Sequence, residues 1–220
     1  MLLEVACFNL ESCLIAQNAR AQRVELCKNY SAGGITPDYI TITESRKQLH
    51  LDLFVMIRPR EGHFLYTEPE FEKMKSQILF CKTEKCDGIV FGILTSENKV
   101  DRIRCLELVE LAKPMQCTFH RAFDEIENSE QALEEIIECG FTRLLTSGKE
   151  KTALEGAKNI SELIQKAQGR ITIMPGGGIR SATISELMKT TTANEFHSSA
   201  ITTKRETADA NEIIKLLSAS

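Results

Sequence analysis

The chain of 220 residues lacks an excess of basic residues, since 27 Lys and Arg stand against 31 Asp and Glu, giving a formal net charge of −4. Proteins that bind DNA or RNA usually carry a basic surface, so we expect no nucleic-acid partner. The chain also lacks an apolar run long enough to span a bilayer. Glu4 interrupts the apolar residues at the start, where a signal peptide needs an unbroken run. These absences predict a cytoplasmic protein without a membrane partner.

Cysteine is plentiful, with eight residues, but none forms a CxxC pair and no group of Cys and His has the spacing of a zinc site. In a reducing compartment, free cysteines pack as small apolar residues, and we expect this of most of the eight. Cys13 and Cys105 lie in helical patterns, whereas Cys27 follows Glu25 in a predicted strand. Cys27 is therefore the thiol whose neighbours differ from those of the others.

No linker rich in Pro, Gly or Ser divides the chain, so residues 1–220 are expected to form a single domain. Short strand-like runs alternate with segments of helical periodicity. The expected strands span residues 2–7, 23–27, 51–58, 88–94, 116–120, 143–146, 171–174 and 195–198. The expected helices span 10–19, 67–82, 101–112, 129–139, 152–167, 181–188 and 208–217, with one more beginning at Thr36 and Pro37. Eight such units predict an α/β fold, the (β/α)8 TIM-type barrel; an open doubly wound sheet is the alternative.

The strand at residues 116–120 raises the question of which side chains face the barrel interior. Side chains alternate along a strand, so Thr118 and His120 share one face while Cys117 and Phe119 share the other. We applied the same alternation to every strand, with the more apolar face toward the helices. The ionisable side chains expected to face inward are Glu4, Glu25, Arg58, His120, Glu195 and His197.

These inward residues lie near the carboxyl ends of strands, where the active sites of barrels lie. Burial of a lone charge costs on the order of several kcal/mol, so the charges must pair with one another or contact a ligand. A self-satisfied network that fixes strand register is the structural alternative for any one of them. For the whole set we favour a ligand site. On the sixth strand the same alternation places Leu145 toward the helices and Thr146 toward this site.

Two loop segments supply further candidates. Gly176, Gly177 and Gly178 follow a proline before a predicted helix, and such a loop can turn backbone N–H groups toward an anion; a tight turn is the alternative. Arg58 and Arg60 flank a second proline, an arrangement suited to recognition of carboxylate or phosphate, although surface salt bridges explain it equally well. Both segments favour an anionic ligand.

Eight segments resemble, in order, the motifs of the CutC family, and the resemblance runs from Leu3 to about Ala200. They are Val24-Glu-Leu-Cys27, Gly33-Gly-Ile-Thr-Pro37, Met56-Ile-Arg-Pro-Arg60, Asp87-Gly-Ile-Val-Phe-Gly92, Thr118-Phe-His-Arg-Ala-Phe-Asp124, Leu144-Leu-Thr-Ser-Gly148, Met174-Pro-Gly-Gly-Gly178 and Glu195-Phe-His-Ser-Ser199. The resemblance implies a TIM-type barrel that is cytoplasmic, forms a homodimer or a higher homo-oligomer and serves copper homeostasis.

The first functional hypothesis follows from this resemblance and is a protein that binds Cu(I). Cu(I) selects thiolates, and Cys27 is expected to point inward beside Glu25, so Cys27 is the expected metal ligand. A second ligand stays open between Cys7, His120 and a thiol of another subunit. A packed thiol is the structural alternative.

The chain departs from the family pattern in two places. Ala19-Arg20-Ala21 stands where many members have glycines, and we expect this change to lengthen the first helix. After Ala200 the chain runs directly into its last helix, where some relatives carry a longer insertion. A function located in that insertion therefore does not transfer to this chain.

The second hypothesis, which the residue chemistry favours, is an enzyme acting on a small anionic or phosphorylated molecule. Glu25 or His120 would act as general base or acid, and Asp124 would orient His120 or accept hydrogen bonds from its loop. The residues expected to contact the substrate are Glu4, Arg58, Arg60, Thr146, Gly176, Gly177, Gly178 and His197. A binding protein without turnover is the third hypothesis.

Overall fold

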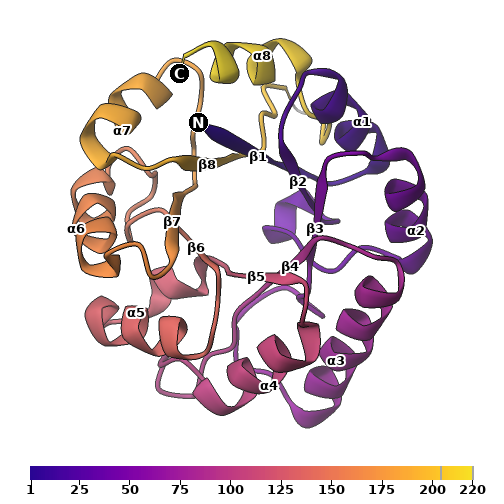
Figure 1. Cartoon of the computed structure of the whole chain (residues 1–220), viewed down its shortest axis with the longest axis vertical. Helices are drawn as coiled ribbons and strands as arrows, with labels where there is room; N and C mark the ends of the chain where they lie inside the picture. Colours follow the sequence, from indigo (N-terminus) through magenta and orange to yellow (C-terminus); the bar gives the residue numbers. More distant parts are fainter. Residues whose placement is uncertain (204, 220) are drawn as a thin grey trace.

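Eight parallel strands form a central barrel, and helices surround it (Figure 1). The computed structural model describes residues 1–203 and 205–219. The strands are β1 (Leu2–Cys7), β2 (Arg23–Leu26), β3 (Asp52–Met56), β4 (Gly88–Phe91), β5 (Gln116–Phe119), β6 (Arg143–Thr146), β7 (Thr172–Pro175) and β8 (Glu195–Ser198). The helices are α1 (Leu10–Asn18), α2 (Tyr39–Gln48), α3 (Glu68–Thr83), α4 (Arg102–Ala112), α5 (Ser129–Glu138), α6 (Ala157–Ala167), α7 (Ile184–Thr191) and α8 (Ala210–Ser218), with 3₁₀ turns η1 (Tyr30–Ala32) and η2 (Arg121–Glu125). The predicted (β/α)8 barrel is confirmed.

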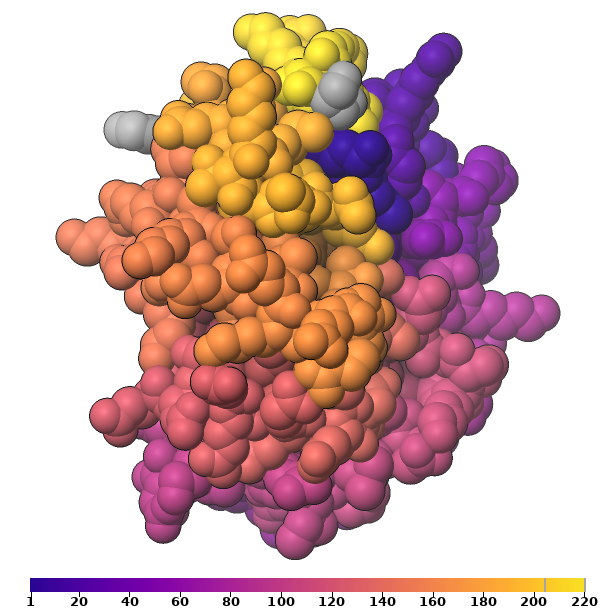
Figure 2. Space-filling model, turned by 60° about the vertical axis from the view of Figure 1, so that its left-hand side comes forward, coloured from indigo at the N-terminus to yellow at the C-terminus, as the bar shows by residue number. Residues whose placement is uncertain are grey.

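The two ends of the chain meet at the closure of the barrel. The strand order is β7-β6-β5-β4-β3-β2-β1-β8, and β7 meets β8 at a parallel bridge between Gly176 and His197. In the space-filling view the first residues (indigo) lie beside the last third of the chain (orange and yellow), as the pairing of β1 with β8 requires (Figure 2). Within the described residues, no helix has the length and apolarity needed to cross a bilayer.

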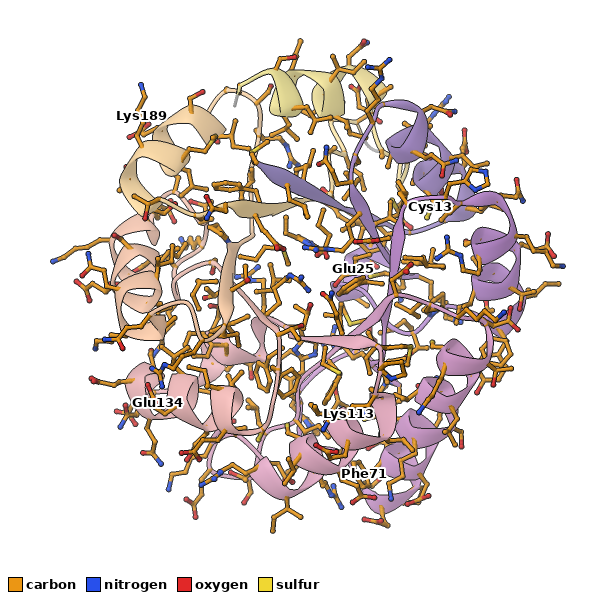
Figure 3. All side chains as sticks on the ribbon, viewed as in Figure 1. Cys13, Glu25, Phe71, Lys113, Glu134 and Lys189 are labelled. Atoms are coloured by element: carbon orange, nitrogen blue, oxygen red, sulfur yellow. The ribbon has the colours of Figure 1, made fainter. Side chains whose placement is uncertain are left out.

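The alternation expected for β5 is confirmed. Cys117 and Phe119 belong to the large apolar cluster between the strands and the helices. The interior of the barrel holds a smaller apolar cluster, which consists of Cys27, Phe54, Met56 and Val90. Glu25 also lies inside the ring of strands, whereas Phe71 and Glu134 lie among the outer helices (Figure 3). Two layers of side chains, one on each face of the strands, therefore define the core.

The alternation predicted for β6 is wrong. Leu145 lines a cavity inside the barrel, while Leu144 packs in the outer cluster. Thr146 donates its hydroxyl to Asp124 in the loop after β5. The inward face of β6 also carries Arg143, which pairs with Glu195 at 2.6 Å. This buried charge has its partner inside the barrel, and that partner fixes the orientation of the strand.

Helix starts agree with the sequence in one case and differ in another. The predicted start at Thr67 is confirmed, because Thr67 and Glu70 form a capping box at the start of α3. The predicted start at Thr36 is wrong, since α2 begins at Tyr39. The Thr36 hydroxyl instead accepts the backbone N–H of Arg58 at 2.8 Å, and it donates to Gln77. Thr36 thus holds the end of β3 rather than a helix.

The expected lengthening of the first helix is also wrong. α1 ends at Asn18, and Arg20 adopts a left-handed conformation with φ 68°. Helices commonly end at such a residue, and glycine favours that position because it has no Cβ. The chain therefore keeps the turn that glycine permits while placing an arginine in it.

Candidate functional site

A cavity of about 310 Å³ opens at the carboxyl ends of the strands. Its walls come from β1, β2, β3, β6 and β8 and from the loops after β1, β2, β3, β5, β7 and β8. The predicted site residues that line it are Glu25, Arg58, His120, Gly177, Gly178 and His197. The strand ends therefore bring together half of the twelve predicted site residues.

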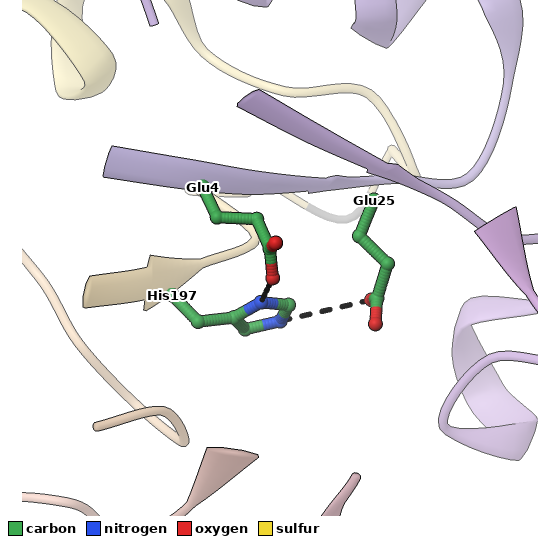
Figure 4. A group of neighbouring side chains, drawn as sticks. All are labelled: Glu4, Glu25 and His197. Atoms are coloured by element: carbon green, nitrogen blue, oxygen red, sulfur yellow. Dashed lines mark hydrogen bonds and ion pairs between the residues drawn. The ribbon is translucent and has the colours of Figure 1, made fainter. Parts of the chain in front are cut away.

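Glu4, His197 and Glu25 form a line of ionisable groups at the base of this cavity (Figure 4). His197 Nδ1 lies 2.7 Å from Glu4 Oε1, and its Nε2 lies 3.8 Å from Glu25 Oε2. Glu4 is fully buried and Glu25 is 3 % exposed. Because Glu4 fixes the Nδ1 side of the imidazole, His197 presents Nε2 to Glu25 and to the cavity.

A buried ion network supports Glu4 from below. Arg23 donates to both Glu4 and Glu195, and Arg143 also pairs with Glu195. Both guanidinium groups lie over the ring of Phe54, at 4.9 and 5.2 Å from its centroid. Opposite charges thus satisfy one another at the floor, and the network holds the position of Glu4.

The protonation of this line of residues follows from its surroundings. Burial alone would raise the pKa of Glu4, but Arg23 and His197 outweigh it and lower that pKa to about 2. Burial raises the pKa of Glu25, because nearby His197 offsets the loss of solvent only in part. Burial would lower the pKa of His197, but Glu25 and Glu4 outweigh it and raise that pKa. Glu4 is therefore the fixed anion, while Glu25 and His197 compete for a proton.

His120 occupies a different environment in the same cavity. It is 4 % exposed, and its Nδ1 accepts the backbone N–H of Ala122, so the neutral ring carries its proton on Nε2. Nε2 is buried and has no hydrogen-bond partner among the described residues. Burial, with a smaller effect of Arg58, lowers the pKa of His120 to about 3. His120 is thus neutral at ordinary pH, and its free Nε2–H makes it a hydrogen-bond donor rather than a base.

Of the three arginines that line the cavity, Arg121 pairs with a carboxylate and the other two do not. Arg58 donates to the carbonyls of Ala32, Gly34 and Gly62, and so joins the loops after β2 and β3. Within residues 1–203 and 205–219, neither Arg58 nor Arg180 has an ion-pair partner. A cavity with two such cations favours an anionic ligand.

Six predicted site residues do not line the cavity: Glu4, Cys27, Arg60, Asp124, Thr146 and Gly176. The Arg60 guanidinium donates to Glu70 at 2.7 Å and to loop carbonyls, so it organises the loop after β3. Asp124 accepts from Thr146 and pairs with Arg121 at 2.7 Å, so it organises the loops after β5 and β6 and does not orient His120. Gly176 forms the bridge to β8, and only the two glycines after it reach the cavity.

Cys27 lies beside Glu25, as the sequence predicted. Its thiol donates to Glu25 Oε2 at 3.3 Å and is 1 % exposed. Burial, followed by the charge of Glu25, raises the pKa of Cys27 well above its usual range. Met56 belongs to the same interior cluster and also lines the cavity. A thiol and a thioether, both soft donors, thus lie in one part of the site.

The oxygen and nitrogen donors of the site form a separate group. Ligand atoms of Glu4, Glu25 and His197 lie within 4.8 Å of one another. Both oxygens of Glu4 are already engaged, one by His197 and one by Arg23. The atoms left for a ligand are His197 Nε2 and the Glu25 carboxylate, of which Oε1 has no partner among the described residues. The carboxylate is a hard donor that does not match the preference of Cu(I) for thiolates, whereas the imidazole nitrogen can bind copper.

Four arginines of the site were not predicted from the sequence: Arg23, Arg121, Arg143 and Arg180. Arg23 lies two residues before Glu25 on β2, so strand alternation places both on the inward face and could have predicted Arg23 as well. Arg180 closely follows the glycine triplet, where a cation would complement an anion cradle. Arg143 could not be found in this way, because the alternation of β6 was assigned to the wrong face.

The fold and the cavity define a (β/α)8 barrel protein with a polar, ligand-sized site at the carboxyl ends of its strands. The chain belongs to the CutC family, whose model matches residues 1–202. A family protein CutC from Chromobacterium violaceum is 45% identical over 199 residues, which cover 90% of this chain and 81% of the relative. A human protein named copper homeostasis protein cutC homolog is 42% identical over 203 residues, covering 92% of this chain and 74% of the relative.

Solved structures agree with this assignment. The crystal structure of CutC from Streptococcus agalactiae matches with a TM-score of 0.87 and 33% identity, covering 90% of this chain and 98% of that chain. Phosphoribosylanthranilate isomerase from Thermotoga maritima matches with a TM-score of 0.66 at 15% identity, covering 100% of this chain and 97% of that chain. The second likeness shows the barrel fold alone.

Proposed function

We propose that this protein binds a small anionic molecule at the barrel mouth and transfers a proton to or from it. The observation that carries the proposal is the Glu4, His197 and Glu25 line, which lies at the base of a cavity whose wall carries unpaired arginine charge. Buried acid–base pairs with raised pKa values are typical of catalytic sites. A purely structural network would satisfy Glu25 Oε1, which has no partner among the described residues.

Each group has a distinct role in this proposal. Glu25 and His197 share one proton and exchange it with the bound molecule, while Glu4 holds the imidazole in place. His120 donates from Nε2 to an oxygen of the ligand, since its ring is neutral at ordinary pH. Arg58 and Arg180 supply the positive charge that attracts an anion.

A ligand screen followed by proton exchange tests this function. The melting temperature of the wild type would be measured with phosphate, sulfate, pyruvate and glycerol 3-phosphate, and NMR in D₂O would follow deuterium incorporation into each organic anion that binds. We expect Glu25→Gln to bind the same anion without exchanging its protons. Glu134→Gln, on an outer helix, is the matched control and should behave as the wild type. The proposal fails if no anion stabilises the protein, or if exchange persists in Glu25→Gln.

The names of the relatives favour a second candidate function, the binding of Cu(I) as cargo. Cys27 would supply a thiolate and Met56 a thioether, and both lie in the interior cluster beside the cavity. Because burial raises the pKa of Cys27, metal uptake would have to release its proton, and Glu25 accepts that hydrogen bond already. A thiol and a thioether in one cluster support the binding of Cu(I) more strongly than a single thiol would.

Titration of Cu(I) against a competing chelator tests the second function. We expect Cys27→Ala to lose most of the affinity for Cu(I) and Met56→Leu to lose part of it. Cys139 lies at the carboxyl end of α5, away from Cys27, so Cys139→Ala should leave the affinity unchanged. Equal affinity in the wild type and Cys27→Ala would refute copper binding at this site.

We further propose that the protein works in the cytoplasm, where its eight free thiols stay reduced, and that it self-associates as the family resemblance implies.

A further inference from the structure

The loop after β7 forms a second polar wall of the cavity, apart from Glu25 and His197. Gly177 and Gly178 line this wall, with φ angles of 105° and 71° in the left-handed region. The backbone N–H groups of Gly178, Ile179 and Arg180 donate to no acceptor within residues 1–203 and 205–219. Successive N–H groups in such a turn form a concave site for an anion.

Two guanidinium groups flank the same turn. Arg180 donates to the carbonyls of Ile179 at 2.7 Å and Ile201 at 3.0 Å, which joins the loops after β7 and β8. Arg121 is held by Asp124 and Ser147, and its Nη1 lies 3.3 Å from the place where a Gly177 Cβ would be. A side chain at Gly177 would therefore occupy the space beside this guanidinium.

The opposite side of the cavity is aromatic. β3 lies across the barrel from β7, and Phe64 follows β3 (Figure 1). The Phe64 ring lies 4.7 Å from the ring of His120, while Phe8 packs against Tyr30 at 5.0 Å. Phe8, Tyr30 and Phe64 all line the cavity. A ligand that spans the cavity thus meets Arg121, Arg180 and backbone amides at one end. At the other end it meets aromatic rings, with the Arg58 guanidinium 4.9 Å from the centroid of Phe64.

We propose that the ligand is a phosphate monoester with an apolar or aromatic body. Its phosphate would lie against the turn after β7, between Arg121 and Arg180, and its body would lie against Phe8 and Phe64. This inference rests on the proposed function, because Glu25 and His197 lie in the same cavity and would act on the organic part. Phosphate favours this end because it accepts several hydrogen bonds at once and pairs with guanidinium groups in a bidentate manner.

Titrations followed by ³¹P NMR test the inference with inorganic phosphate, glycerol 3-phosphate and phenyl phosphate. We expect saturable binding that tightens in that order, because only phenyl phosphate offers a ring to Phe64. Loss of a charged hydrogen bond weakens binding about tenfold or more. We therefore expect Arg180→Gln to bind phenyl phosphate about tenfold more weakly than the wild type. Arg102→Gln removes a surface arginine paired with Glu138 and is the matched control.

Arg180 also joins two loops, so a second variant guards against misfolding. Arg121→Gln removes the other guanidinium, and circular dichroism would check the fold of each variant. Equal affinity of phenyl phosphate for the wild type, Arg180→Gln and Arg121→Gln would overturn the inference, as would absence of saturable binding to the wild type. Glu25→Gln separates the proposed phosphate site from the proposed proton transfer. This variant should bind phenyl phosphate as the wild type does, while it no longer exchanges the protons of a bound organic anion.

Discussion

The acid sensitivity of the fold should depend on His120. Its pKa is about 3 in the folded protein, because burial, aided by Arg58, disfavours the charged ring, whereas an unfolded chain gives histidine a pKa of about 6.5. Protonation therefore favours the unfolded state. Neutral His120 contributes stability above about pH 6.5, and this contribution falls as the pH falls toward 3. By linkage, the loss between about pH 7 and pH 5 is about 2 kcal/mol in the free energy of unfolding.

Urea denaturation of the wild type and of His120→Gln, each at about pH 7 and pH 5, measures this contribution. Glutamine does not titrate, so the variant should lose about 2 kcal/mol less than the wild type over this interval. The raised pKa of His197 acts in the opposite direction, since its contribution is present at low pH and is lost as pH rises, and it is common to both proteins. His63→Gln, at an exposed position, should match the wild type. An equal loss in the wild type and His120→Gln would refute the reasoning.

Two further substitutions test the fold itself. Arg20→Gly should stabilise the protein by about 1 kcal/mol in urea denaturation, because Arg20 occupies a left-handed conformation that glycine adopts freely; an unchanged midpoint would contradict this account of the turn. Arg23→Met should destabilise it by about 3–5 kcal/mol, because Glu4 and Glu195 would both lose their buried partner. Arg102→Met, which breaks an exposed pair, should cost at most about 1 kcal/mol and serves as its control.

The inward and outward faces of a strand were predictable where its residues alternate in polarity. On β5, Thr118 alternates with Cys117 and Phe119, and the contrast in polarity gives the correct faces. On β6, Leu144 and Leu145 are alike, so alternation carries no information there. The inward direction of that strand follows from the pairing of Arg143 with Glu195, a residue far away in the sequence that only the barrel brings close.

The loops were harder to predict for a different physical reason. Arg58 and Arg60 are two residues apart on the sequence, yet one lines the cavity and the other pairs with Glu70. Their separation depends on Thr36, which holds the backbone at Arg58 after β3 has ended. Once a strand ends, alternation no longer applies, and contacts from other loops decide where a side chain points.

Glu25 connects the two candidate functions. One of its oxygens lies 3.3 Å from the Cys27 thiol and 3.8 Å from His197 Nε2. A cation bound at Cys27 would stabilise the Glu25 carboxylate and so lower its pKa, whereas proton transfer requires that pKa to stay raised. Occupation of the thiol by Cu(I) would therefore oppose acid–base chemistry at His197. The geometry makes the two functions competitors for one carboxylate, and a metal bound there would act on the barrel mouth as an inhibitor.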